Sequence, residues 1–249
     1  MSKAKTEFRP LTSADRDEIR ALAKRAKNAN TLMMRAINAM GGQLENVLTA
    51  LPGPVQRQME GITATALETA YNAASRVGGR APDLGKYSHE AAVVMTGGVG
   101  GAAGLSAVAA ELPVTTTLIL RAIQRVAADH GFDPNDEAVR KECLKVLGAG
   151  GPGTGDDGVD TSFLTSRFAI HGTALREIIQ KVAPRFALTM GQKLGAQTVP
   201  ILGGVAGATI NYAFINYYKN MAHIRFGLQA LAREHDPQDI RSAFEAALR

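Results

Sequence analysis

Tryptophan is absent from this 249-residue chain, aromatic residues make up only 5% of it, and cysteine occurs once, as Cys143. So few aromatic residues, with little alternation of β-branched ones, argue against a sheet protein. The 45% of hydrophobic residues suffice for a core, which we expect to consist of Ala, Leu, Ile, Val and Met. A single cysteine excludes an intramolecular disulfide and fits a reducing compartment. Composition therefore predicts an all-α protein with a single compact multi-helix domain.

The motifs of several well-known chemistries are also missing. The five histidines are scattered and form no His-Glu-x-x-His pattern, and no Gly-x-Ser-x-Gly elbow is present. The glycine-rich segment 148–160 lacks the Gly-Lys-Ser/Thr ending of a phosphate-binding loop, and its aspartates lack EF-hand spacing. We therefore expect no metal and no cofactor. Residues 148–160 are interpreted as a flexible link between two halves of the domain.

Helix signals run along nearly the whole chain. Thr12 or Ser13 can cap the first helix, and the short helix before residue 148 should bury Cys143 as an inert thiol. The residue before a proline is pushed away from α geometry, so Pro113 is predicted to separate two helices. The expected helices cover residues 13–40, 43–51, 55–77, 85–110, 113–130, 134–147, 161–182, 184–196, 200–234 and 237–248.

Two glycine-rich stretches without charged residues form the strongest local pattern. They cover residues 91–110 and 194–218, and segments 97–102 and 203–208 agree at five of six positions. Each is long enough to span a bilayer, which takes roughly 20 apolar residues, but polar residues in the second favour a buried helix. We expect two Gly-rich buried helices, related as a possible internal repeat, that pack against each other. Glycines four residues apart leave a groove without Cβ atoms, so the candidate ligand-binding residues include Gly97, Gly100, Gly101, Gly104, Gly203 and Gly207.

An acid and three threonines lie between the two stretches, in the sequence ELPVTTT at 111–117. In the structural interpretation Glu111 complements a helix dipole and the threonine hydroxyls cap free N–H groups. In the functional interpretation these residues form a polar site at the end of an apolar groove. Glu111 would then act as acid or base, or bind a head group, with Thr115 or Thr116 orienting the ligand. Asn211 of the second stretch completes the candidate ligand-binding set.

The net charge of +5 arises entirely from residues 1–35, which hold nine basic and four acidic side chains. A basic amphipathic arm over residues 1–40 can bind anionic lipid, although a solvated helix face that binds nothing has the same composition. Phe8 is the only aromatic residue of this arm, so no nucleic acid is expected as a partner. The candidate membrane-binding residues are Lys3, Lys5, Arg9, Arg16, Arg20, Lys24, Arg25 and Lys27.

The order and spacing of these motifs resemble the EcsC family over roughly residues 40–235. In the first half the similar segments are GGVGGAAG at 97–104, ELPVTT at 111–116, ILR at 119–121, Ala127, Gly131 and CLKVL at 143–147. In the second half they are Lys193, AQ at 196–197, VP at 199–200, GG at 203–204, GA at 207–208, IN at 210–211 and Phe214. The resemblance implies a bacterial α-helical protein on the cytoplasmic side with a membrane connection. It supplies no catalytic residues, and residues 41–249 would form the EcsC-like domain.

We therefore expect a peripheral protein at the inner face of the cell membrane that binds lipid or an acyl chain. Its partner would be an anionic membrane surface or a lipid. One alternative is an enzyme acting on a lipid-like substrate, with Glu111 as acid or base. The other is an adaptor of a membrane transporter that docks through its glycine face, a role that replacing Gly203 and Gly207 by Leu would test.

Overall fold

Every regular element in the described part of the chain is an α-helix. The computed structural model describes residues 8–39, 53–77, 104–148, 174–197 and 203–249. The helices within these ranges are α1 (Ser13–Ala39), α3 (Gly53–Val77), α5 (Gly104–Asp129), α6 (Glu137–Leu147), α7 (Leu175–Gln197), α8 (Gly203–Leu231) and α9 (Pro237–Leu248). The only β-type pairing in these ranges is an isolated parallel bridge between Arg9 and His235. The all-α class is thus confirmed.

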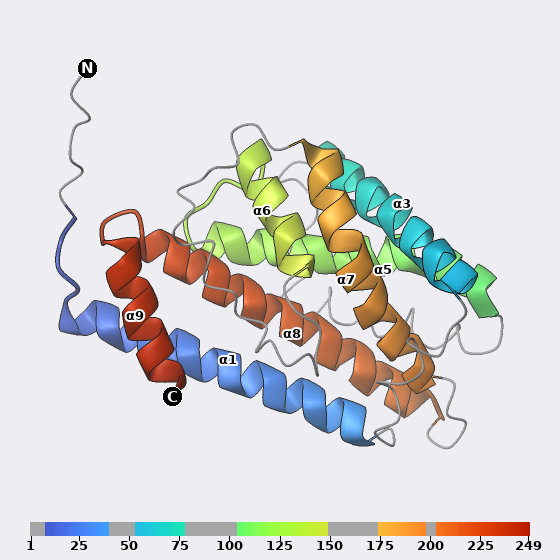
Figure 1. Cartoon of the computed structure of the whole chain (residues 1–249), viewed down its shortest axis with the longest axis horizontal. Helices are drawn as coiled ribbons and strands as arrows, with labels where there is room; N and C mark the ends of the chain where they lie inside the picture. Colours follow the sequence, from blue (N-terminus) through green and yellow to red (C-terminus); the bar gives the residue numbers. More distant parts are fainter. Residues whose placement is uncertain (1–7, 40–52, 78–103, 149–173, 198–202) are drawn as a thin grey trace.

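Helix α8 connects the two sides of the molecule (Figure 1). Helix α5 packs between α3 and α8, while α6 and α7 pack on each other and α7 also contacts α3. On the other side of α8 lies α1, and the last helix, α9, packs against α1. The first and last helices of the chain are therefore neighbours. One contiguous set of buried apolar side chains joins all seven helices of the described ranges into a single domain.

Aromatic side chains hold the centre of this core, although the chain has few of them. Tyr217, Tyr218, Phe186, Phe226 and Phe244 are the largest fully buried side chains among the described residues. The expectation of a core built only from Ala, Leu, Ile, Val and Met was therefore wrong. A rare residue type can still dominate a core, because each aromatic ring buries about 150–250 Å².

The short helix α6 ends at Leu147 as expected, but it begins at Glu137, three residues after the start expected from the sequence. Asp136 caps it, accepting a hydrogen bond from the amide of Ala138, and Gly131 ends the preceding segment with a φ of 74°. The side chains on its expected apolar face are all buried, namely Val139, Cys143, Val146 and Leu147. Of the expected link over 148–160, only Gly148 lies within the described residues.

The helix breaks expected at Pro113 and before Pro184 were wrong, because both prolines lie inside continuous helices. A proline in a helix interior costs about 3 kcal/mol, so packing must offset it. In α5 the buried Leu112 and Thr116 flank Pro113, and the Thr117 hydroxyl donates to the Pro113 carbonyl at 2.7 Å. Burial on both sides of each proline keeps the helix continuous. The helix expected at 43–51, residues 85–103 of the helix expected at 85–110, and residues 161–173 of the helix expected at 161–182 lie outside the described residues.

Candidate functional site

The continuity of α5 changes the interpretation of the Glu111 segment. No helix begins at Pro113, so two expectations for this segment were wrong: the capping role of Glu111 and the threonines, and a phosphate site at a helix N-terminus. The Thr115 and Thr116 side chains are 2% and 0% exposed, and their hydroxyls have no hydrogen-bond partner among the described residues. Buried hydroxyls normally have a partner, so these two mark a polar spot inside the core. Glu111 and Asn211 lie on α5 and α8, but their side chains are outside the description.

The glycine groove falls largely outside the described residues. Gly97, Gly100 and Gly101 lie beyond them, whereas Gly104 and Gly203 begin α5 and α8. These two helices do pack against each other, and Ala122 and Ile215 are buried together at their seam. The direct contact between the two glycine segments, with Gly207 in it, and the internal repeat stay predictions.

Helix α1 carries a basic face and an apolar face. Arg16, Arg20, Lys24 and Lys27 are exposed, and their spacing of four, four and three residues places them on one arc of the helix. The buried residues of the other arc face α8 and α9, and they are Ile19, Leu22, Ala23, Ala26 and Ala29. The basic face is therefore fixed on the rigid body of the protein. Lys3 and Lys5 lie outside the described residues.

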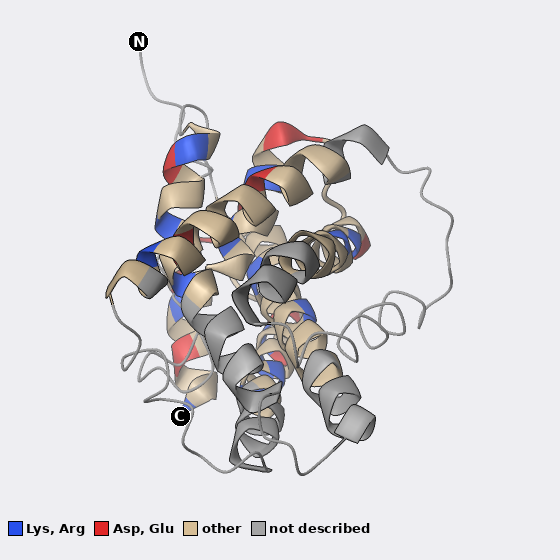
Figure 2. Ribbon diagram, turned by 90° about the vertical axis from the view of Figure 1, so that its right-hand side faces the viewer, with Lys and Arg blue, Asp and Glu red and all other residues tan. Residues whose placement is uncertain are grey.

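Three basic residues of α1 have polar contacts within the protein. Arg20 forms an ion pair with Asp17 one turn away. Arg25 donates to the Asn220 side chain of α8 at 2.8 Å, and Lys27 donates to a carbonyl of α9 at 3.2 Å. Arg25 is also exposed, but it fastens α1 to α8 and lies off the arc that Arg16, Arg20, Lys24 and Lys27 share. Elsewhere charges of both signs lie on several helices (Figure 2), and residues 36–249 carry no net charge.

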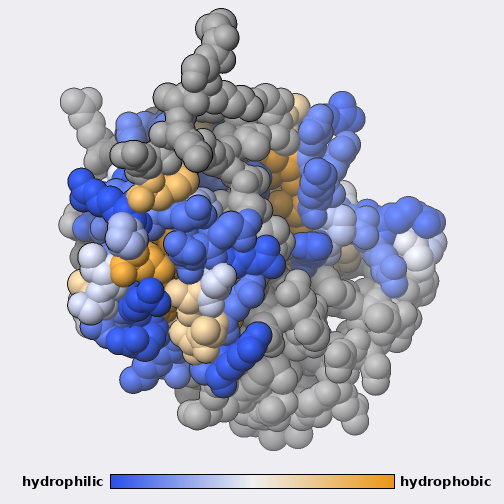
Figure 3. Space-filling view, turned by 60° about the vertical axis from the view of Figure 1, so that its left-hand side comes forward, coloured by the Kyte–Doolittle hydropathy of each residue, from blue (hydrophilic) through white to orange (hydrophobic). Residues whose placement is uncertain are grey.

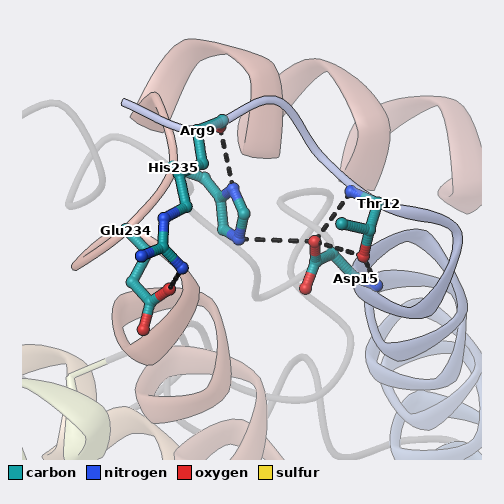
Figure 4. Close-up of polar contacts among 5 residues, drawn as sticks. All are labelled: Arg9, Thr12, Asp15, Glu234 and His235. Atoms are coloured by element: carbon teal, nitrogen blue, oxygen red, sulfur yellow. Dashed lines mark hydrogen bonds and ion pairs between the residues drawn. The ribbon is translucent and has the colours of Figure 1, made fainter. Parts of the chain in front are cut away.

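A polar clasp, formed by Arg9, Thr12, Asp15, Glu234 and His235, joins the segment at the start of α1 to the turn between α8 and α9 (Figure 4). His235 Nδ1 lies 2.9 Å from the Arg9 carbonyl oxygen, and its Nε2 lies 3.4 Å from the Asp15 carboxylate. The Arg9 side chain forms an ion pair with Glu234 at 3.2 Å. Hydrogen bonds from the Thr12 hydroxyl and amide hold the pKa of Asp15 below its ordinary value, and His235 contributes in the same direction. The clasp fixes the start of α1 beside the start of α9.

A buried carboxylate joins α6 to α8. Glu142 is 3% exposed and accepts hydrogen bonds from Arg225 at 2.6 Å, Lys145 at 3.0 Å and Gln229 at 3.2 Å. Burial alone would raise the pKa of Glu142, but the charges of Arg225 and Lys145 outweigh it and keep that pKa below its ordinary value. The neighbouring Cys143 is fully buried, which raises the pKa of its thiol far above the ordinary value. The carboxylate is ionised and satisfied, as in a structural ion pair.

Two histidines meet where α5 ends. His130 Nε2 lies 3.1 Å from His223 Nδ1 of α8, and both rings are partly exposed. Burial is the main cause that lowers the pKa of both imidazoles, to about 4 for His223. No sequence pattern indicated this pair or the Glu142 cluster, because their members are 93 and up to 87 residues apart. Glu142 lies in sequence between positions of α6 that were expected to be buried. An acidic residue at such a position was the one sequence signal that could have drawn attention to it.

No helix of the described ranges is long and apolar enough to cross a membrane. Figure 3 shows the face that comes forward from the left-hand side of Figure 1, and the described residues on it are mostly hydrophilic, with smaller hydrophobic areas between them. No curated protein and no solved structure matches the chain. The model of the EcsC protein family matches residues 58–231, more than two thirds of the sequence. That stretch holds α5 to α8 whole and most of α3, with the Glu142 cluster and the histidine pair. By this match, the chain belongs to the EcsC protein family.

Proposed function

We propose that this protein docks peripherally on an anionic membrane surface of the cytoplasmic face through the basic arc of α1. The observation that carries the proposal is the placement of Arg16, Arg20, Lys24 and Lys27 on one exposed arc of a helix whose other face is buried. Because the core already holds the backbone of α1, docking through this arc requires no ordering of the backbone. Each basic side chain near an anionic membrane contributes about 1 kcal/mol, and salt weakens this attraction.

Liposome flotation of the purified full-length protein tests this proposal. We expect flotation with phosphatidylserine-containing vesicles at low salt, and none with neutral vesicles or at high salt. The variant Arg16→Gln/Arg20→Gln/Lys24→Gln should lose about 3 kcal/mol, roughly a hundredfold in partitioning. Its matched control is Arg57→Gln/Arg176→Gln/Lys181→Gln, which removes three exposed basic residues from α3 and α7.

Three results would contradict surface docking by α1. Equal losses in both triple variants would mean that net charge, and not the arc, drives binding. Flotation that resists high salt would instead point to insertion of the glycine-rich stretches into the bilayer. Absence of flotation with every vesicle would reject the proposal altogether.

Lipid-like ligand binding in the core is the second candidate, with turnover by Glu111 as its enzymatic form. The unpartnered hydroxyls of Thr115 and Thr116 favour it, because a bound polar group would satisfy them. Thr115→Val/Thr116→Val keeps the shape of both side chains. Without a ligand this change should be neutral or stabilising, whereas with one the protein should lose lipid that mass spectrometry detects in the wild type. A variant that co-purifies with the same lipid would rule this candidate out.

A further inference from the structure

The histidine pair consists of His130, in the turn after α5, and His223, in the middle of α8. Their facing nitrogens are 3.1 Å apart, and the ring centroids are 5.3 Å apart with the ring planes at 75°. Only one proton fits between two nitrogens at this distance, so one imidazole donates and the other accepts. The two rings meet nitrogen to nitrogen, one from the turn after α5 and the other from α8.

The two imidazoles are also in the protonation state that metal ions require. Burial lowers the pKa of both rings, so the pair is neutral at neutral pH. Neutral imidazole is the form that binds borderline metal ions such as Zn²⁺ and Cu²⁺. Both side chains are only partly buried, which leaves a path for an ion and for its water ligands.

We propose that His130 and His223 form a two-histidine site for a borderline divalent cation, Zn²⁺ or Cu²⁺. Two metal–nitrogen bonds of about 2.05 Å that meet at 100–110° separate their nitrogens by about 3.1–3.4 Å. The observed 3.1 Å lies in this range, so the nitrogens need to shift by a few tenths of an ångström at most, while the rings turn until both lone pairs point to the ion. The proton now shared by the two facing nitrogens moves to an outer ring nitrogen, so both rings stay neutral and no net proton is released.

The surrounding charges set the strength of this site. Glu18 and Asp129 favour a cation beside the pair, whereas Arg25 and Lys219 oppose it. Among the described residues no third histidine, cysteine or carboxylate completes a ligand set. The other ligands are therefore water molecules, and binding is weaker than at structural zinc sites with four protein ligands.

Copper electron paramagnetic resonance and zinc calorimetry on the full-length protein, without vesicles, test this site. We expect one Cu²⁺ per chain with hyperfine splitting from two imidazole nitrogens. His130→Gln and His223→Gln should each weaken Zn²⁺ affinity about tenfold or more. The control His89→Gln/His171→Gln removes two other histidines and should bind as the wild type does.

Thermal melts separate loss of the site from loss of the fold. A cation that binds only the native state raises the Tm of the wild type, and this rise should vanish in both variants even if their own Tm differs. Equal zinc affinity in the wild type and both variants would overturn the proposal, as would a copper spectrum without two nitrogens. The experiment contains no membrane, so its failure leaves the docking proposal untouched.

Discussion

At the scale of single residues, buried polar groups give this protein its most specific contacts. Glu142 is enclosed by partners from its own helix and from α8, and its side chain is 4% exposed. Removing one member of a buried ion pair strongly lowers the free energy of unfolding, because the other charge stays buried without a compensating partner. Glu137 and Lys141 form an ion pair on the same helix, but Glu137 is 69% exposed, so water can replace its partner.

We predict that Glu142→Met lowers the free energy of unfolding by about 3 kcal/mol, because it removes the carboxylate that Arg225 contacts. Glu142→Met/Arg225→Met should lose less, since it leaves no buried guanidinium behind. The control Glu137→Met should stay within about 0.5 kcal/mol of the wild type. Urea unfolding measures all three. A loss in Glu142→Met no greater than in Glu137→Met would show that the cluster contributes little.

Because of the histidine pair, we predict that the free energy of unfolding decreases in mild acid. His223 has a pKa of about 4 in the folded protein against 6.5 ordinarily, so the unfolded chain takes up its proton first as the pH falls. Stability should decline from about pH 6.5 towards pH 4, and the contribution of this group should level off below that. His223→Gln should flatten the decline, as thermal melts across this range would reveal. Parallel curves for the two proteins would refute the assignment.

At the scale of helices, capping signals in the sequence correspond to observed ends. The Thr12 hydroxyl accepts from the Asp15 amide at 3.2 Å, and the Thr12 amide donates to the Asp15 carboxylate at 2.7 Å. This reciprocal pair fixes the start of α1, as expected from the sequence. Proline was the misleading signal. Its low helix propensity predicted that Pro113 and Pro184 lie outside helix interiors, but tertiary packing keeps both inside continuous helices.

We predict that Thr12→Ala costs about 1 kcal/mol of stability, because the amide of Asp15 loses its acceptor. Thr12→Ser keeps the hydroxyl and should retain most of this stability. Carboxyl titration by NMR adds a second readout: the pKa of Asp15 should rise in Thr12→Ala, since the hydroxyl bond that lowers it is gone. An unchanged Asp15 titration would contradict the observed geometry.

At the scale of the whole molecule, α1 and α9 close the domain although both lie outside the family match, which begins after α1 and ends before α9. Five apolar residues of α1 are buried against the rest of the protein, so this helix shares the core. Membrane docking through its basic arc therefore needs no detachment of α1. Truncation is then a poor test of docking, because it removes the charges and part of the core together.

We predict that deletion of residues 1–39 destabilises the protein by about 5 kcal/mol, chiefly through exposure of the surface that Ile19 and Leu22 cover. Such a loss is comparable with the whole stability of many domains, so the truncated chain should be largely unfolded or aggregated. Circular dichroism and gel filtration would detect this. The triple variant of the basic arc should melt with the wild type. A truncated chain with the wild-type Tm would make α1 a dispensable arm.

The sequence by itself determined the helical class, the start of α1, the end and the buried face of α6, and the family. These features depend on neighbours within one or two turns, and their signals are local. Only the tertiary structure decided that α5 and α7 continue through their prolines, that Glu142 meets Arg225, and that His130 meets His223. Each of these features depends on residues that packing brings together from distant parts of the sequence. Burial of these residues then determines how much they stabilise the fold and which groups are protonated. The spacing of residues along the chain does not predict which of them come into contact, because many other pairs are equally far apart in sequence. Helix packing decides which pairs touch.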